Sequence, residues 1–261
     1  MSILGRQQKD FILRIVRNSI FEKPFLILKN KFYVLSKNKY GKNFIYDQET
    51  QKIIMKLGSD SNCIDIGCHK GQFLKDFLVV SPNGKHFAFE PIPELFENLR
   101  LQFQTTNLFQ IALSKTKGST VFYNVVTGQG VSGLKEREYD RQHKTVKINV
   151  DTDLLDNIIP KDLPIDFIKI DIEGGEFDAM LGGKDLIEKY KPIIVFEFEK
   201  GAADKYGVTP EMMYDFVVNQ MKMKLSLQKY WLKGNRVFCY RLDEFESQFE
   251  TGENFYFIAF E

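Results

Sequence analysis

From about residue 60 onward, short apolar runs alternate with segments whose apolar residues recur at helical spacing. Nearly continuous apolar runs of this kind are typical of strands buried on both faces, and their alternation with helices indicates parallel strands. The predicted strands are Cys63–Ile66, His86–Phe89, Phe109–Leu113, Phe167–Asp171 and Ile193–Phe198, with predicted helices over Phe73–Val80 and Leu95–Phe103. We therefore expect an α/β fold with a doubly wound, mostly parallel sheet.

An insertion interrupts this alternation. Val121–Val126 and Val146–Val150 predict an extra pair of strands within about residues 115–150, joined through the glycine-containing loop Thr127–Leu134. The charged and polar residues of this region carry no recognisable substrate code. We expect the insertion, together with the region after residue 200, to determine what the protein acts on.

The C-terminal third predicts a different end to the sheet. Thr209 and Pro210 provide a helix N-cap and a proline at the first helical position, so a helix is expected through about Asn219. Asn254–Phe260 reads as a strand that follows Val237–Tyr240 too closely for a crossover helix. We therefore expect the last strand to be antiparallel and to pair with Val237–Tyr240.

The N-terminal segment carries an amphipathic pattern and a local positive charge. Residues 1–46 contain ten Lys/Arg and two Asp/Glu, whereas the remainder contains 26 and 33. One helical face is apolar, formed by Phe11, Ile12, Ile15, Val16 and Ile20. We expect a basic helical extension over residues 1–58 and the doubly wound domain over 59–261. The helix could contact an anionic membrane surface, or it could cover one end of the domain with its basic side in water.

Composition excludes several classes of protein. A net charge of +1 argues against nucleic acid as a partner, and 14% aromatic residues argue against disorder. Three cysteines without zinc-ligand spacing indicate reduced thiols. Charged residues interrupt the N-terminal apolar run, and the chain has no run of about 18 apolar residues. We expect a cytoplasmic protein, at most peripheral to the inner membrane face, whose oligomeric state the sequence leaves open.

The segment CIDIGCHKGQF, residues 63–73, has the features of a ligand-binding loop. A buried strand leads through Asp65 to Gly67 and Gly71, where the missing Cβ lets a ligand approach the backbone at a helix N-terminus. His69 replaces the middle glycine of a dinucleotide fingerprint, and the sequence of a phosphate-binding P-loop does not occur. An acidic side chain before the turn suits a cationic ligand such as an aminoacyl sulfonium.

Two further groups of acids follow predicted strands. Glu90, at the tip of the second strand, can accept hydrogen bonds from a ribose diol, although an acid before a Pro-x-Pro turn can also simply face solvent. Strand alternation places Asp171 and Glu173 on one phase, and Glu197 and Glu199 in a matching phase on the next strand. Clustered carboxylates raise one another's pKa, which suits a general base. They also suit Mg²⁺ or Ca²⁺, but we predict no metal here.

Together these segments resemble the FkbM-type methyltransferases, S-adenosylmethionine-dependent enzymes with the Rossmann-like class I methyltransferase fold. The resemblance spans about residues 60–200 and rests on DIGCHKG (65–71), FEP (89–91), ALS (112–114), KIDIEGGE (169–176) and VFE (195–197). Many members carry Ala-Asn where this chain has Cys68-His69, and Ser132 matches a family serine only loosely.

The resemblance implies S-adenosyl-L-methionine as the cofactor and a role for each motif. The glycine loop would hold the aminoacyl part, Glu90 the ribose, and the ALS region the adenine edge. The cofactor-binding residues so implied are Asp65, Gly67, Cys68, His69, Gly71, Glu90, Pro91, Ile111, Ala112 and Asp171. Asp171 and Glu173 would face the reacting centre.

We therefore predict O-methylation of a hydroxyl on a sugar, glycan or natural-product intermediate. An alcohol acceptor needs a group that takes its proton, and Asp171 is the first candidate, with Glu173 and His69 as further catalytic residues and His143 of the insertion as another candidate. Two alternatives stay open: a non-catalytic protein that binds a nucleoside ligand, and an NAD-dependent oxidoreductase, which His69 disfavours.

Overall fold

A computed structural model describes residues 39–136, 144–234 and 237–261. Thr50–Glu261 is one compact unit, which the following paragraphs concern. The helix expected over residues 11–20 and His143 lie outside the described residues, and the domain boundary at residue 58 stays a prediction. Within the described ranges, no helix has the length and apolar character needed to cross a membrane.

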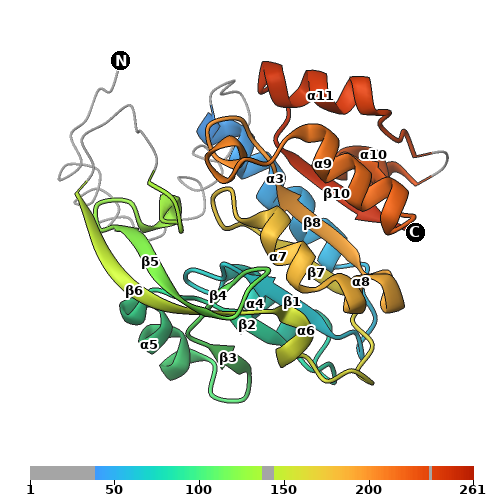
Figure 1. Ribbon diagram of the computed structural model, residues 1–261. Coiled ribbons are helices and arrows are strands. Elements are labelled where there is room, and N and C mark those ends of the chain that lie inside the picture. Colours follow the sequence, from blue (N-terminus) through green and yellow to red (C-terminus); the bar gives the residue numbers. More distant parts are fainter. Residues whose placement is uncertain (1–38, 137–143, 235–236) are drawn as a thin grey trace, which may run out of the picture. The chain divides into compact units, whose positions relative to one another are not determined.

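A seven-stranded sheet forms the centre of the unit (Figure 1). Its order is β3-β2-β1-β7-β8-β10-β9, and every neighbouring pair is parallel except the two that β10 makes. The strands are β1 (Cys63–Ile66), β2 (Phe87–Phe89), β3 (Asn107–Phe109), β7 (Phe167–Ile170), β8 (Ile193–Glu197), β9 (Lys224–Ser226) and β10 (Tyr256–Phe260). The strand order reverses between β1 and β7, so a ligand crevice is expected at the carboxyl ends of these two strands. The predicted doubly wound sheet with an antiparallel last strand is confirmed.

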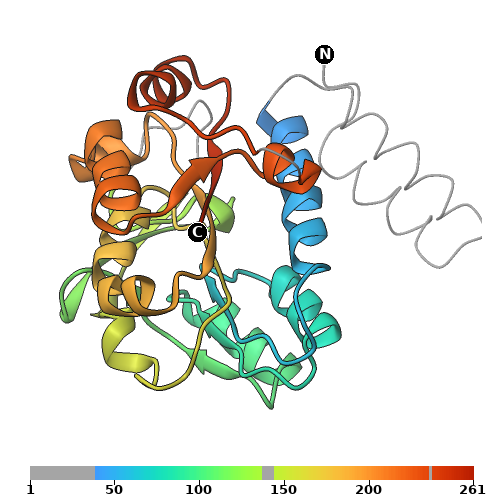
Figure 2. The same cartoon turned by 90° about the vertical axis from the view of Figure 1, so that its right-hand side faces the viewer.

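Helices cover both faces of this sheet. Figure 2 shows α7 (Glu176–Gly182), α8 (Lys184–Tyr190) and α9 (Pro210–Tyr214), yellow to orange, on one face, and the cyan α4 (Gln72–Val80) on the other. Phe77 of α4 packs edge-on against Phe167 of β7 with ring centroids 5.7 Å apart, and both side chains are fully buried. Burial of one such side chain contributes roughly 1.5–3 kcal/mol, so the apolar strands and the helix faces stabilise each other.

The remaining helical segments of Thr50–Glu261 connect or flank the strands. They are α5 (Pro93–Gln102), α6 (Leu155–Ile158), α10 (Gln228–Lys233), α11 (Leu242–Thr251), and the short turns η1 (Gln129–Val131) and η2 (Ala203–Tyr206). The helix α3 (Lys39–Ile54) lies mostly in the preceding unit and ends in this one. As predicted, Thr209 caps α9: its side chain accepts a hydrogen bond from the Met212 amide. The helix continues as a π-helical segment, η3 (Asp215–Gln220), to about the predicted end.

The insertion forms a second, three-stranded sheet of order β4-β6-β5. The predicted pair is confirmed as β5 (Gly118–Val125) antiparallel to β6 (Thr145–Asp153). The single strand predicted over Phe109–Leu113 is wrong, because β3 ends at Phe109 and β4 (Ala112–Leu113) belongs to the second sheet. An uninterrupted apolar run does not reveal that the chain changes sheets within it.

The expected strand over Val237–Tyr240 is also wrong. β10 instead lies between β8 and β9, with Phe257 opposite Phe196 and Ile258 opposite Ser226. Two hydrogen bonds still link the predicted segment to β9: the Tyr240 amide donates to the Leu225 carbonyl at 2.8 Å, and the Ser226 hydroxyl donates to the Phe238 carbonyl. The short strand β9 therefore takes the place that the sequence pattern assigned to the later segment.

Candidate active site

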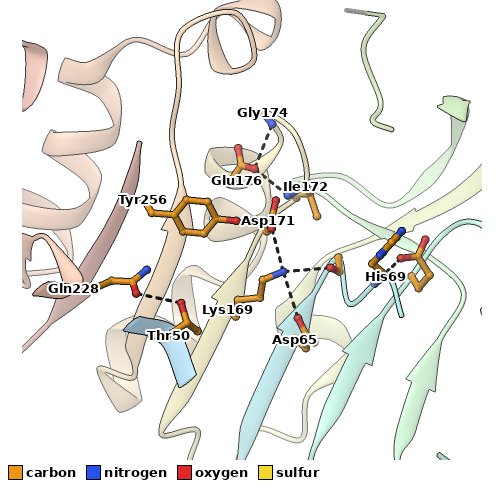
Figure 3. Close-up of polar contacts among 12 residues, drawn as sticks. Thr50, Asp65, His69, Lys169, Asp171, Ile172, Gly174, Glu176, Gln228 and Tyr256 are labelled. Atoms are coloured by element: carbon orange, nitrogen blue, oxygen red, sulfur yellow. Dashed lines mark hydrogen bonds and ion pairs between the residues drawn. The ribbon is translucent and has the colours of Figure 1, made fainter. Parts of the chain in front are cut away.

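The reversal point between β1 and β7 brings three charged side chains together. Asp65 and Lys169 are directly opposite each other in the β1–β7 register, and Asp171 follows the last residue of β7. Figure 3 shows the Lys169 side chain extending between these two carboxylates. Its Nζ lies 3.7 Å from Asp65 Oδ1 and 3.3 Å from Asp171 Oδ2. Parallel pairing therefore explains why residues about 100 positions apart meet.

The glycine loop closes tightly over this cluster. Gly67 adopts φ +76°, and a Cβ at this position would lie 2.1 Å from the Asp171 carbonyl oxygen. The Gly67 and Cys68 amides both donate to the Phe89 carbonyl, which fixes the loop to the end of β2. Gly71, also left-handed at φ +71°, is the N-cap residue of α4. Glycine is thus required at position 67 by close backbone approach as well as by conformation.

The Asp65 side chain is enclosed by the protein. It is fully buried, and neither carboxylate oxygen accepts a hydrogen bond from the described residues. Burial raises its pKa to about 6, the Lys169 cation lowers it, and the charge of Asp171 raises it. A buried carboxylate without hydrogen-bond donors is costly, so this position favours a cationic group in its vicinity.

Glu90 lies at the end of β2, where the sequence predicts it. Its two carboxylate oxygens accept hydrogen bonds from the backbone amides of His69, at 2.9 Å, and Ile92, at 3.0 Å. Burial raises the pKa of Glu90 to about 7, while these two hydrogen bonds act to lower it. The carboxylate thereby links the glycine loop to the start of the next helix, and its oxygens retain lone pairs for a further donor.

The two residues that depart from the family pattern lie in the loop itself. Cys68 is buried, and burial raises the pKa of its thiol, so the side chain is not a thiolate nucleophile near neutral pH. His69 has the left-handed φ of +49°. Partial burial, followed by the nearby Lys70 and Lys169 charges, lowers the pKa of His69, so the neutral imidazole predominates near pH 7.

The turn after β7 is held by the carboxylate of Glu176. Glu176 Oε1 accepts from the amides of Ile172, at 3.0 Å, and Gly174, at 3.2 Å (Figure 3). The turn includes left-handed backbone at Glu173, φ +58°, and at Gly174, φ +106°. Burial raises the pKa of Glu176 to about 7. Glu176 therefore stabilises the turn, and the turn orients Asp171 and Glu173.

Three carboxylates lie close together around this turn. Asp171, Glu173 and Glu197 each place one oxygen within 4.8 Å of the other two. Glu197 ends β8, as the matching strand phase predicts, whereas Glu199 is outside this group. Such an arrangement could hold a divalent cation, and the absence of a metal stays a prediction.

Tyr256 and Tyr206 extend the site and were not predicted. Tyr256, the first residue of β10, donates its hydroxyl to Asp171 Oδ2 at 2.5 Å (Figure 3). The Tyr206 hydroxyl accepts from the Leu134 amide at 3.0 Å, and its ring, together with the Ala202 carbonyl, leaves no room for a Cβ on Gly174. Tyr206 therefore connects the insertion to the acidic turn. Lys169 is the first residue of the KIDIEGGE motif, but the sequence pattern assigns it no role.

The other predicted residues are placed as follows. Pro91 is buried beside Glu90, and Ile111 is half-buried just before β4. Ala112 is buried in a small apolar cluster with Ile92, Leu95, Phe122 and Val150. Their contacts with a cofactor stay predictions. Ser132 is also buried, and its hydroxyl accepts from the Val125 amide, which gives it a structural role in the insertion.

The fold and the motifs together define the class of protein. The doubly wound sheet, with its antiparallel β10 and its glycine loop at the reversal point, forms a Rossmann-like α/β fold. Residues 65–224 match the Methyltransferase FkbM domain. The chain belongs to this family.

A curated protein is similar in sequence. The chain is 28% identical over 149 residues to the 2-O-methyltransferase NoeI of Sinorhizobium fredii, a match that covers 50% of this chain and 60% of that protein. The chain therefore spans less than two thirds of the curated relative.

Two solved structures are also similar. Methyltransferase FkbM from Methylobacillus flagellatus aligns with 15% identity and a TM-score of 0.48, over 79% of this chain and 44% of that one. Fibrillarin from Aeropyrum pernix, crystallised with S-adenosyl-L-methionine, aligns with 7% identity and a TM-score of 0.41, over 82% and 74% of the two chains. At these low values, the fold assignment rests on the strand order.

Proposed function

We propose that the protein is an S-adenosylmethionine-dependent O-methyltransferase that acts on a hydroxyl of a sugar, glycan or natural-product intermediate. The observation that carries the proposal is the position of the Asp171–Glu173–Glu197 carboxylates beside the glycine loop, at the reversal point of the sheet. Membership of the FkbM methyltransferase family supports the reaction type. The similarity to a 2-O-methyltransferase supports oxygen as the acceptor atom.

The residues at the reversal point of the sheet fit this cofactor. Asp65 and Asp171 flank the buried Lys169, Glu173 and Glu197 lie close to Asp171, and Glu90 contacts the glycine loop. Acidic groups therefore outnumber the lysine, which gives the site the negative character that a sulfonium requires. The glycine loop would hold the aminoacyl part, and Glu90 would accept hydrogen bonds from the ribose. The bound cofactor supplies a methyl group already activated on sulfur.

The chain then has two tasks, to orient the acceptor and to take its proton. Alignment of acceptor oxygen, methyl carbon and sulfur can supply roughly 7–11 kcal/mol of the barrier. Asp171 is held at Oδ2 by Tyr256 and Lys169, so Oδ1 is the oxygen we assign to the acceptor hydroxyl. His69 is the alternative proton acceptor, because its lowered pKa leaves the imidazole neutral near pH 7.

Calorimetric titration with S-adenosylhomocysteine tests the cofactor assignment, with NAD as the control ligand. We expect micromolar affinity for the first ligand alone. Glu90→Ala should weaken it by roughly 1–3 kcal/mol through lost hydrogen bonds, whereas Glu97→Ala, on an exposed helical position, should not. An unchanged dissociation constant in Glu90→Ala would remove Glu90 from the site. Absence of binding would instead support a non-catalytic role.

A transfer assay tests the chemistry. Methyl-labelled cofactor is incubated with a panel of monosaccharides and methyl glycosides, and label in the acceptor is counted. Asp171→Asn should lower turnover more than it lowers cofactor affinity. Asp162→Asn, at a fully exposed position, is the matched control. Wild-type turnover in Asp171→Asn would contradict its role. Because we predict no metal, dialysis against EDTA should leave turnover unchanged.

A further inference from the structure

Lys169 occupies a position that the proposed chemistry does not explain by itself. It lies in the middle of a central strand and is only 4% exposed. Besides its two carboxylate neighbours, its Nζ donates a hydrogen bond to the Gly67 carbonyl at 3.3 Å. The ammonium also faces the Phe73 ring of α4, 5.4 Å from the centroid. One cation thus contacts β1, the glycine loop, the end of β7 and the first turn of α4.

This arrangement differs from a simple buried ion pair. A lysine taken out of water needs compensation, and one carboxylate at hydrogen-bond distance would provide it. Here the ammonium is shared: Asp65, directly opposite on β1, is 3.7 Å away, and the half-buried Asp171 is nearer, at 3.3 Å. The third contact is the carbonyl of Gly67, the residue whose position leaves no room for a Cβ beside the Asp171 carbonyl oxygen. The geometry therefore joins the loop to the carboxylate at the reacting centre.

We propose that Lys169 is a positioning residue of the cofactor site, whose ammonium fixes the Gly67 carbonyl and the Asp171 carboxylate relative to each other and compensates the charge of Asp65 beneath the loop. The assignment rests on the proposed function, because it takes the glycine loop as the cofactor-binding segment. Lys169 itself need not touch the cofactor. Its loss should disturb binding through Gly67, Asp65 and Asp171.

Electrostatics provide a readout that a merely structural lysine would not change. Burial raises the pKa of Asp65 to about 6 even though Lys169 lowers it. Without the ammonium, the pKa should rise further, by about 1–3 units for an opposite charge at this range. Among the described residues, Asp171, Glu90, Cys68 and His69 also act electrostatically on Asp65 or Lys169. Because these groups are common to all Lys169 variants, a displaced pH profile reports the lost ammonium.

The experiment is calorimetric titration of S-adenosylhomocysteine from pH 5.5 to pH 9 with the whole chain. The variants are Lys169→Met and, as matched control, Lys117→Met, which removes an exposed lysine paired with Asp153. We expect Lys117→Met to match the wild type. Lys169→Met should bind about tenfold more weakly at pH 7. The midpoint of the rise of its affinity with pH should lie about 1–3 pH units above that of the wild type. An affinity within about twofold of the wild type, with the same pH profile, would overturn the assignment.

A double-mutant comparison keeps the test decisive if Lys169→Met does not fold. Asp65→Asn with Lys169→Met removes the buried anion together with the cation, and Asp65→Asn alone is its reference. We expect the double variant to bind about tenfold more weakly than Asp65→Asn. Equal affinities would show that Lys169 only compensates Asp65, which overturns the positioning role. If the wild type does not bind S-adenosylhomocysteine, the proposed function fails together with this inference. If the wild type binds and the Lys169 variants bind with the same affinity, only this inference is overturned.

Discussion

Glu176 makes the turn after β7 sensitive to pH. The carboxyl is 1% exposed, and burial raises its pKa from 4.5 to about 7. Between these values the folded chain keeps a proton that the unfolded chain releases, so the free energy of unfolding falls as the pH rises. At about 1.36 kcal/mol for each pKa unit, the loss between pH 5 and pH 8 is about 2.5 kcal/mol.

Glu176→Gln removes this titration and keeps an acceptor oxygen for the amides of Ile172 and Gly174. The free energy of unfolding of the variant, relative to that of the wild type, should therefore be about 2.5 kcal/mol higher at pH 8 than at pH 5. Urea unfolding at both pH values, followed by fluorescence of the single tryptophan, Trp231, measures the difference. Glu188→Gln, at an exposed position of α8, is the control. A constant difference between Glu176→Gln and the wild type at the two pH values would refute the reasoning.

Two further predictions concern the loops around the site. Gly67→Ala should lower the free energy of unfolding by more than about 3 kcal/mol, because its Cβ would lie 2.1 Å from the Asp171 carbonyl oxygen. Gly207→Ala, with a similar φ of +72° but no neighbour within 4 Å, should cost only about 1–2 kcal/mol; equal urea midpoints for the two variants would contradict the close-contact argument. Tyr206→Phe removes the acceptor for the Leu134 amide and should cost about 1 kcal/mol. Hydrogen exchange at that amide should then become faster, and an unchanged exchange rate would show that the bond does not hold the insertion.

Local patterns predict the central strands well and fail where the chain changes partners. Cys63–Ile66 is a strand in both sequence and structure, because its run of apolar residues is buried on both faces. The segment after Phe109 is also apolar, yet it crosses to the second sheet. Val237–Tyr240 has the composition of a strand, but β10 already pairs with β9 on that side. Pairing between distant segments decides these cases, and hydrophobic periodicity does not encode it.

The same distinction holds for the site. Glu90, Asp171 and Glu197 follow from their places at strand ends, and Asp65 from its place one residue before the end of β1, since parallel strands bring those ends to one edge. Tyr256 enters the cluster from a strand that runs in the opposite direction, so its first residue lies at the edge where β8 ends. Tyr206 approaches through a short turn with no motif of its own. Lys169 shares the strand phase of Asp171, and this shared phase was the signal that could have revealed it.

The position of β10 between β8 and β9 has a consequence for the order of folding. Within the described chain, β9 pairs with β10 alone, although β9 precedes it by about 30 residues. During synthesis β9 thus lacks its partner until β10 has emerged, so this edge of the sheet should be completed late. Because Tyr256 opens β10, the hydroxyl that binds Asp171 arrives in the same step. An intermediate that lacks β10 would have both an open sheet edge and an incomplete site, so ligand binding would report the docking of this strand.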